Sequence, residues 1–161
     1  MRNIILGMSA FALAAVATPV LAQDEGASEP LTVSGSATVV SDYRFRGISQ
    51  TDKNFAVQGG LTVSHESGLY AGVWGSSIDE YVAAASDQEI DLIAGFKKNL
   101  GGATIDVGVI YYYYPGAEQI VPGYASDFFE PYVSVSVALG PVTAKLSAAY
   151  APKQSALSIG E

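Results

Sequence analysis

The stretch that decides the fold runs from Leu31 to His65 and reads LTVSGSATVVSDYRFRGISQTDKNFAVQGGLTVSH. Both of its ends alternate between apolar and polar residues. In the first segment one side of an extended chain carries Leu31, Val33, Gly35, Ala37 and Val39, with serine and threonine between them. A period of two residues is typical of a β-strand. From Phe55 the pattern returns, so the stretch predicts two strands joined by the polar, aromatic segment Ser41–Thr51.

Five further segments follow, and four of them alternate in the same way. They cover residues 69–77, 89–96, 105–114, 129–139 and 142–150. The exception is 69–77, where both sides are apolar. Glycine and β-branched residues are frequent throughout, which disfavours helices. The sequence therefore predicts an all-β fold of about seven antiparallel, up-and-down strands.

The N-terminal region has the features of a cleaved signal peptide. Arg2 precedes the apolar run Ile4–Val20, and small residues precede Gln23, so we expect residues 1–22 to be removed and the protein to be exported. Residues 23–30 are acidic and read as a flexible leader, and residues 31–161 as the β domain. The chain has no cysteine, so disulfides cannot stabilise it. Its net charge of −8 argues against a nucleic-acid partner.

The lengths of strands and connections favour a membrane protein over a soluble sandwich. Short turns are expected near Ser67, Gly101 and Gly140, and long loops around Gly47, Glu80 and Pro122. Outer-membrane barrels have short turns on one side and long loops on the other. Most segments also reach about ten residues, the length of a tilted membrane strand. We therefore predict a transmembrane β-barrel in the outer membrane.

Aromatic residues gather where the segments meet the long loops. Aromatic rings of this kind form belts at the bilayer interface. We expect interface positions at Tyr43, Phe45, Phe55, Tyr111, Tyr113, Phe129 and Tyr150. Bacterial barrels have an even number of strands, at least eight. Seven are visible, so we expect the barrel domain to be incomplete at its C-terminus.

Three motifs resemble the TorF-type porin family of Gram-negative bacteria. They are SDYRFRGISQT at 41–51, VQGGL at 57–61 and GLYAGVWGS at 68–76, with Glu89-Ile90-Asp91 and Tyr150-Ala151-Pro152 fitting later segments. The resemblance covers nearly all of the chain after the signal peptide. It implies an outer-membrane barrel longer than this chain. It does not indicate a particular solute.

The polar side of the predicted strands is where a pore would lie. Expected lumen residues are Gln58, Glu89, Asp91, Asp106, Glu130 and Lys145. Acidic groups outnumber basic ones, and carboxylates favour cations in channels. Arg44 and Arg46 could form a basic constriction or bind lipopolysaccharide phosphates. The alternative is that both pair with nearby acids such as Asp42 and Asp52 and order the loop.

Other sites are weaker. His65, the only histidine, lies beside Ser64 and Glu66, but neighbouring strand residues point to opposite faces, so these three cannot form a catalytic triad. Asp87, Glu89 and Asp91 share a face and could bind calcium, without the accompanying glycine loop. We expect no enzyme activity, cofactor or metal.

The sequence thus predicts a porin-like barrel that passes small solutes, with a weak preference for cations. A non-conducting structural or adhesion barrel that acts through its outer loops is the alternative, and a secreted soluble β-protein is a third. Expected partners are outer-membrane lipid, lipopolysaccharide, small solutes and the barrel-assembly machinery. The oligomeric state is not indicated.

Overall fold

The structure, a computed structural model, describes residues 30–117, 126–154 and 156. One antiparallel sheet of seven long strands dominates it, and each strand pairs with the next one along the sheet in the order β1-β4-β5-β6-β7-β8-β9. The strands are β1 (Leu31–Val40), β4 (Ala56–His65), β5 (Leu69–Ser77), β6 (Gln88–Leu100), β7 (Ala103–Tyr113), β8 (Phe128–Leu139) and β9 (Val142–Ala149). The all-β, antiparallel prediction with seven strands is confirmed.

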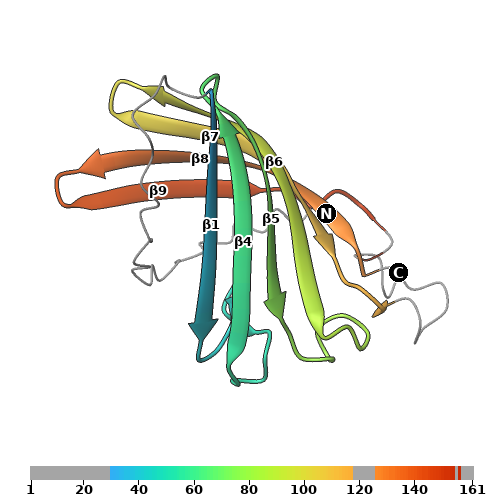
Figure 1. The fold of residues 1–161 in the computed structure, drawn as a ribbon. Coiled ribbons are helices and arrows are strands. Elements are labelled where there is room, and N and C mark those ends of the chain that lie inside the picture. Colours follow the sequence, from blue (N-terminus) through green and yellow to red (C-terminus); the bar gives the residue numbers. More distant parts are fainter. Residues whose placement is uncertain (1–29, 118–125, 155, 157–161) are drawn as a thin grey trace, which may run out of the picture.

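A small hairpin of β2 (Arg44–Phe45) and β3 (Ile48–Ser49) lies inside the connection from β1 to β4. The described part of the chain contains no helix long and apolar enough to cross a bilayer. Figure 1 shows the sheet twisting steadily, from the upright β1 to the nearly horizontal β8 and β9 in that view. Among the described strands the sheet is open, since β1 and β9 are its two edges and do not pair with each other.

Long and short connections alternate. Turns at residues 66–68, 101–102 and 140–141 lie at one end of the sheet. The connections at 41–55 and 78–87, and the described ends of a third connection at 114–117 and 126–127, lie at the other. In Figure 1 the β6–β7 and β8–β9 turns are at the upper left, whereas the loops after β1 and β5 are at the bottom. The predicted alternation is therefore confirmed. Pro122, within the third long connection, lies outside the described residues.

The two faces of the sheet differ in chemistry because the strands pair in register. Val33 pairs with Val63, and Leu61 pairs with Val73, so apolar side chains share one face. That face is exposed: Leu146 is 72% and Val57 66% exposed. The opposite face is rich in polar and aromatic residues and is where the buried positions gather. The apolar face will be called the outer face, and the polar face the inner face.

The register also assigns the two faces of β5, the strand whose faces the sequence left ambiguous. Tyr70 and Trp74 lie on the inner face with buried Ser76, while Leu69 and Val73 are exposed on the outer face.

Glycines make room for aromatic rings on the inner face. One row across the sheet reads Tyr70, Gly95, Gly108, Tyr132. A Cβ at Gly95 would lie 2.5 Å from the Tyr70 hydroxyl, and one at Gly108 would lie 2.7 Å from the Tyr132 hydroxyl. The two rings therefore fold over the two glycines. Packing of a ring over a strand glycine stabilises sheets that would otherwise lack a side chain there.

Candidate functional site

Four carboxylates lie on the inner face and are buried: Glu89, Asp91, Asp106 and Glu130. Their strands, β6, β7 and β8, are adjacent in the sheet. Burial of a charged group is costly unless a partner compensates for the lost water. The hydrogen-bond and ion-pair partners therefore show which of these carboxylates are already compensated.

Loop 41–55 provides two of these partners, Tyr43 and Arg46, and folds as a compact unit. The hairpin turns at Arg46 and Gly47, which both have positive φ angles of 50° and 87°. Two such residues between paired Phe45 and Ile48 match a two-residue type I′ turn. Glycine suits this turn, but arginine is strained in it. A non-glycine residue at such a position needs compensating contacts elsewhere.

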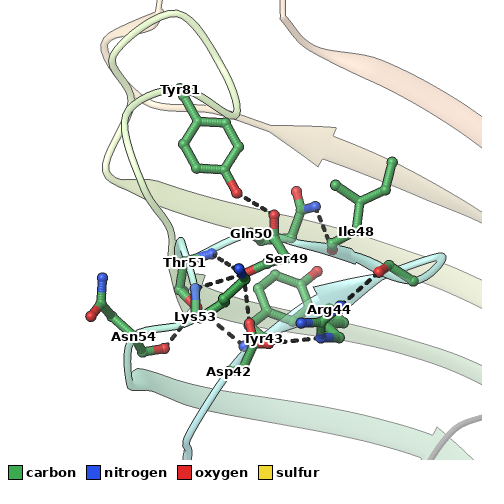
Figure 2. Close-up of polar contacts among 11 residues, drawn as sticks. Asp42, Tyr43, Arg44, Ile48, Ser49, Gln50, Thr51, Lys53, Asn54 and Tyr81 are labelled. Carbon is green, nitrogen blue, oxygen red and sulfur yellow. Dashed lines mark hydrogen bonds and ion pairs between the residues drawn. The ribbon is translucent and has the colours of Figure 1, made fainter.

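Polar contacts hold the base of this loop together (Figure 2). The Ser49 hydroxyl donates to Asp42 at 2.6 Å, and Arg44 Nε donates to Asp42 at 2.7 Å. The backbone N–H of Gln50 donates to the Tyr43 carbonyl at 2.6 Å. The hydrogen bond from Ser49, followed by the contact with Arg44, holds the pKa of Asp42 below its ordinary value despite some opposing desolvation. Asp42 is thus an ionised anchor for the loop.

The second long connection packs against the first. The Tyr81 hydroxyl donates to the Ser49 carbonyl, and the Asp79 N–H donates to the Gln50 carbonyl at 2.7 Å (Figure 2 shows Tyr81 above the loop). A small core of Ile78, Ala83, Tyr112, Tyr114 and Ala117 is buried at this end, with Tyr43 and Phe45 packed against it. The described parts of the long connections therefore pack together over this end of the inner face.

Arg46 reaches from the hairpin to Glu130 on β8. Its Nη2 lies 2.8 Å and 2.6 Å from the two carboxylate oxygens. Glu130 is 3% exposed, whereas the Arg46 side chain is 38% exposed. The Tyr112 hydroxyl donates to Glu130 as well, at 3.3 Å. The ion pair therefore joins the strained turn, which follows β1, to β8, a strand distant from β1 in the sheet order.

Glu89 is satisfied by tyrosines rather than by a cation. The hydroxyls of Tyr43 and Tyr114 donate to its two oxygens at 2.6 Å and 2.8 Å. Burial first, and then the charges of Glu89 and Asp91, raise the pKa of Tyr43 well above its usual range. Tyr43 therefore keeps its proton and remains a donor to Glu89.

Asp106 belongs to a separate cluster nearer the short turns. It accepts a hydrogen bond from the Tyr70 hydroxyl at 2.6 Å and lies 3.7 Å from Lys97 Nζ. The Tyr70 hydroxyl also contacts that of Tyr132. The Lys97 ammonium stands 5.3 Å from the centre of the Tyr70 ring. The negative charge of Asp106 is thus compensated by a nearby ammonium group and a hydroxyl donor.

Asp91 is the exception. It is 8% exposed, and its Oδ1 has no hydrogen-bond donor within the described residues. Its Cα partners on the two neighbouring strands are Trp74 and Tyr112. Tyr43 contacts Trp74 edge-on at 5.5 Å, and Tyr112 stacks on Phe128 at 4.5 Å. Asp91 therefore has an aromatic residue on each neighbouring strand and one buried oxygen without a donor from the described residues.

The predicted lumen residues share the inner face, although two of them are peripheral. Gln58 donates to the Ser76 hydroxyl at 3.3 Å, away from the carboxylates. Lys145 is exposed on the edge strand β9, opposite Ser136. Of the two loop arginines, Arg44 pairs with Asp42, as the local-pairing alternative expected, whereas Arg46 pairs with the distant Glu130.

The predicted interface aromatics divide into two groups. Exposed side chains are those of Phe55, Tyr111, Tyr113, Phe129 and Tyr150. Tyr43 and Phe45 instead turn to the inner face, where Phe45 meets Tyr112 at 5.8 Å. The reason is that loop 41–55 folds over the sheet rather than extending its strands. His65 is exposed, with Nδ1 2.8 Å from the Ser67 hydroxyl.

Sequence reasoning missed the tyrosines that serve the carboxylates. The run Tyr111–Tyr114 contained a usable signal, since alternation places Tyr112 and Tyr114 on the face opposite Tyr111 and Tyr113. Alternation likewise places Tyr132 on the face of Glu130, but Tyr70 lies in the segment that lacks this contrast. Neither pattern indicates that the two rings meet at Asp106, because that contact depends on the glycines between them.

Within the described residues, the fold and the site define an antiparallel β-sheet protein with an acidic, aromatic inner face and an apolar outer face. The chain belongs to the family described as bacterial protein of unknown function (Gcw_chp), which matches residues 24–160. No curated protein and no solved structure matches it.

Proposed function

We propose that this protein is an outer-membrane β-barrel of the TorF porin type that passes small solutes, with a weak preference for cations. The proposal rests on the inverted distribution of polarity across the sheet. Leu146, at 72% exposed, and Val57, at 66%, stand outside, while Glu89, at 2%, and Glu130, at 3%, are buried inside. A sheet in water would bury its apolar face, whereas a barrel in lipid exposes it.

The alternating connections support the same assignment. Long loops gather at one end and tight turns at the other, as in outer-membrane barrels. The open edges of β1 and β9 would leave unpaired backbone groups in hydrocarbon. The barrel we propose is therefore closed by further strands between these two edges. Export through a cleaved signal peptide, insertion by the barrel-assembly machinery and contact with lipopolysaccharide belong to this proposal.

The charge of the inner face supports a weak cation preference. Its buried carboxylates are Glu89, Asp91, Asp106 and Glu130, and the cationic side chains among the described residues on the same side are Arg46, Lys97 and Lys145. Two of these cations are already engaged by Glu130 and Asp106. The surplus is small and negative, which favours entry of cations over anions.

Planar-bilayer recording of the full-length protein tests the proposal. We expect discrete conductance steps. In a potassium chloride gradient, we expect a reversal potential shifted towards the equilibrium potential of potassium. Replacing Glu89 and Asp91 by their amides should reduce cation preference, whereas Glu66→Gln, in an exposed turn, should leave it unchanged. Absence of conductance, or preference for anions, would remove the pore.

A non-conducting barrel is the second candidate, and the packing of the loops favours it. Gln50 and Thr51 are buried where the connection 78–87 covers loop 41–55. Such packing narrows the end of the barrel. If the recordings stay silent while the protein fractionates with the outer membrane and shows heat-modifiable gel mobility, this candidate replaces the pore. A protein found in the soluble fraction would contradict both.

A further inference from the structure

We propose that Asp91 is the binding point for a small organic cation, an alkylammonium group, on the inner face of the sheet. The inference rests on the proposed function, since the cation would reach Asp91 through the lumen. It names the chemical class of solute, which a weak cation preference does not.

The partners of the other carboxylates isolate Asp91. Glu130 is paired with Arg46, Asp106 with Lys97, and Glu89 accepts two tyrosine hydroxyls. Asp91 is more than nine-tenths buried, and its Oδ1 receives no donor from the residues that the structure describes. A buried acceptor without a donor is rare in native proteins and needs an explanation. A bound cation supplies one.

The aromatic surroundings indicate an organic cation. Trp74 and Tyr112 are the direct cross-strand neighbours of Asp91, which places their Cβ atoms about 4.5–5.5 Å from its own. Tyr43 adds a ring beside Trp74. Aromatic faces attract ammonium groups, and tryptophan does so most strongly. A carboxylate whose strand neighbours are both aromatic offers an alkylammonium ion a negative charge and nearby apolar surface for its methyl groups.

A metal ion is a poorer match to this arrangement. Within the described ranges no three His, Cys, Asp or Glu side chains come together as a metal site. Hard cations such as calcium require six or more oxygen ligands. The Trp74 indole provides no oxygen, and the hydroxyls of Tyr43 and Tyr112 are already engaged as donors to Glu89 and Glu130. An alkylammonium ion needs only one carboxylate and apolar surface.

The chain provides its own reporter. Trp74 is the only tryptophan in the sequence and the immediate neighbour of Asp91. The experiment titrates the full-length protein, folded in detergent micelles, with trimethylammonium chloride, whose N–H can donate to Oδ1, and follows Trp74 fluorescence. tert-Butyl alcohol, a neutral molecule of similar shape, and sodium chloride are the matched ligand controls. Asp91→Asn is the test variant. Asp52→Asn, an exposed aspartate at a positive φ that asparagine tolerates, is the control variant.

We expect a saturable fluorescence change with trimethylammonium but not with the alcohol or sodium chloride. The apparent affinity should fall by about tenfold or more in Asp91→Asn, the equivalent of losing about 1.4 kcal/mol, and stay unchanged in Asp52→Asn. No saturable change in the wild-type protein overturns the inference without requiring any variant to fold. An equal response in Asp91→Asn, with folding verified by gel mobility, overturns it too.

Failure of this inference is distinguishable from failure of the pore. Conductance without saturable trimethylammonium binding removes the Asp91 site and leaves the proposal of a pore intact. Saturable, Asp91-dependent binding in a protein that never conducts removes the pore and supports a barrel that holds the cation.

Discussion

The ion pair between Arg46 and Glu130 is the contact whose removal should be most informative. It joins the strained hairpin turn of loop 41–55 to β8, and the two residues are 84 positions apart. Arg46→Ala keeps a non-glycine residue at φ 50°, so the backbone strain stays similar. What changes is the partner of Glu130, a carboxylate that is 3% exposed.

The magnitude depends on which partner stays behind. Among the described residues, Arg46→Ala leaves Glu130 with the Tyr112 hydroxyl, at 3.3 Å, as a donor. Loss of one partner from a fully buried pair costs about 3–5 kcal/mol, and the 38% exposure of Arg46 reduces this to about 1–3 kcal/mol. Glu130→Gln leaves a cation that can turn to water, so about 1 kcal/mol is expected. The arginine variant should therefore be the less stable of the two.

Equilibrium unfolding by urea in detergent micelles measures both effects. Trp74 reports on them, because it contacts Tyr43 of the same loop at 5.5 Å. The matched control is Arg44→Ala, whose exposed pair with Asp42 should contribute little. The double variant should be destabilised by less than the sum of the single variants. If Arg46→Ala is no worse than Arg44→Ala, or if the effects of the two single variants simply add, the assigned role of the ion pair is wrong.

Three further predictions follow from individual contacts. Gly95→Ala should lower the free energy of unfolding by about 1–3 kcal/mol, because its Cβ would lie 2.5 Å from the Tyr70 hydroxyl and 2.7 Å from the Val107 carbonyl. Gly59→Ala is the control and should be tolerated, because its Cβ would lie 3.5 Å from the nearest atom. The midpoints of the thermal change in gel mobility compare the two variants. Tyr43→Phe should cost about 1–2 kcal/mol in urea unfolding through its lost bond to Glu89, and Tyr113→Phe on the outer face much less. Because the pKa of Asp42 is held below its ordinary 3.8, its contacts stabilise loop 41–55 above that value and are lost as the pH falls through the lowered pKa; pepsin cleavage of the loop should rise there, and a pH dependence unchanged in Asp42→Asn would contradict this.

The strands were predictable because each carries its own period. Alternation in 31–40 and 56–65 needs no knowledge of the partner strand, and the register then places Val33 opposite Val63 without adjustment. In residues 69–77 both sides of the strand are apolar, so the sequence alone could not assign Tyr70 and Trp74 to a face. The pairing of this strand with β4 and β6 assigns them to the inner face. The connections alternate because an up-and-down sheet returns to the same end after every second strand.

The inner site was only partly predictable, for a physical reason. Alternation identifies Glu89 and Asp91 as inward-facing, but it does not identify their partners. Those come from a loop that folds back over the sheet, which turns Tyr43 and Phe45 inward and brings Arg46 to Glu130. Such contacts depend on side chains distant in sequence, and the local pattern around Arg46 favoured a nearby acid instead.

The open edges lead to a final prediction about closure. In an antiparallel sheet of seven strands the first and last run in the same direction, so β1 and β9 could pair directly only as parallel neighbours. All-antiparallel closure requires an odd number of strands between them. With one such strand the two edges stand about 10 Å apart, beyond the reach of a disulfide.

The cysteine-free chain makes this testable by cross-linking. Pairs of cysteines placed on β1 and β9, for example Ala37→Cys with Leu146→Cys and the pairs shifted by two residues, should form no intramolecular disulfide when oxidised in the membrane. Val135→Cys with Leu146→Cys is the positive control, because these residues are Cα partners on β8 and β9. Efficient cross-linking of β1 to β9 would show that the edges meet directly, and the proposed insertion of further strands would be wrong.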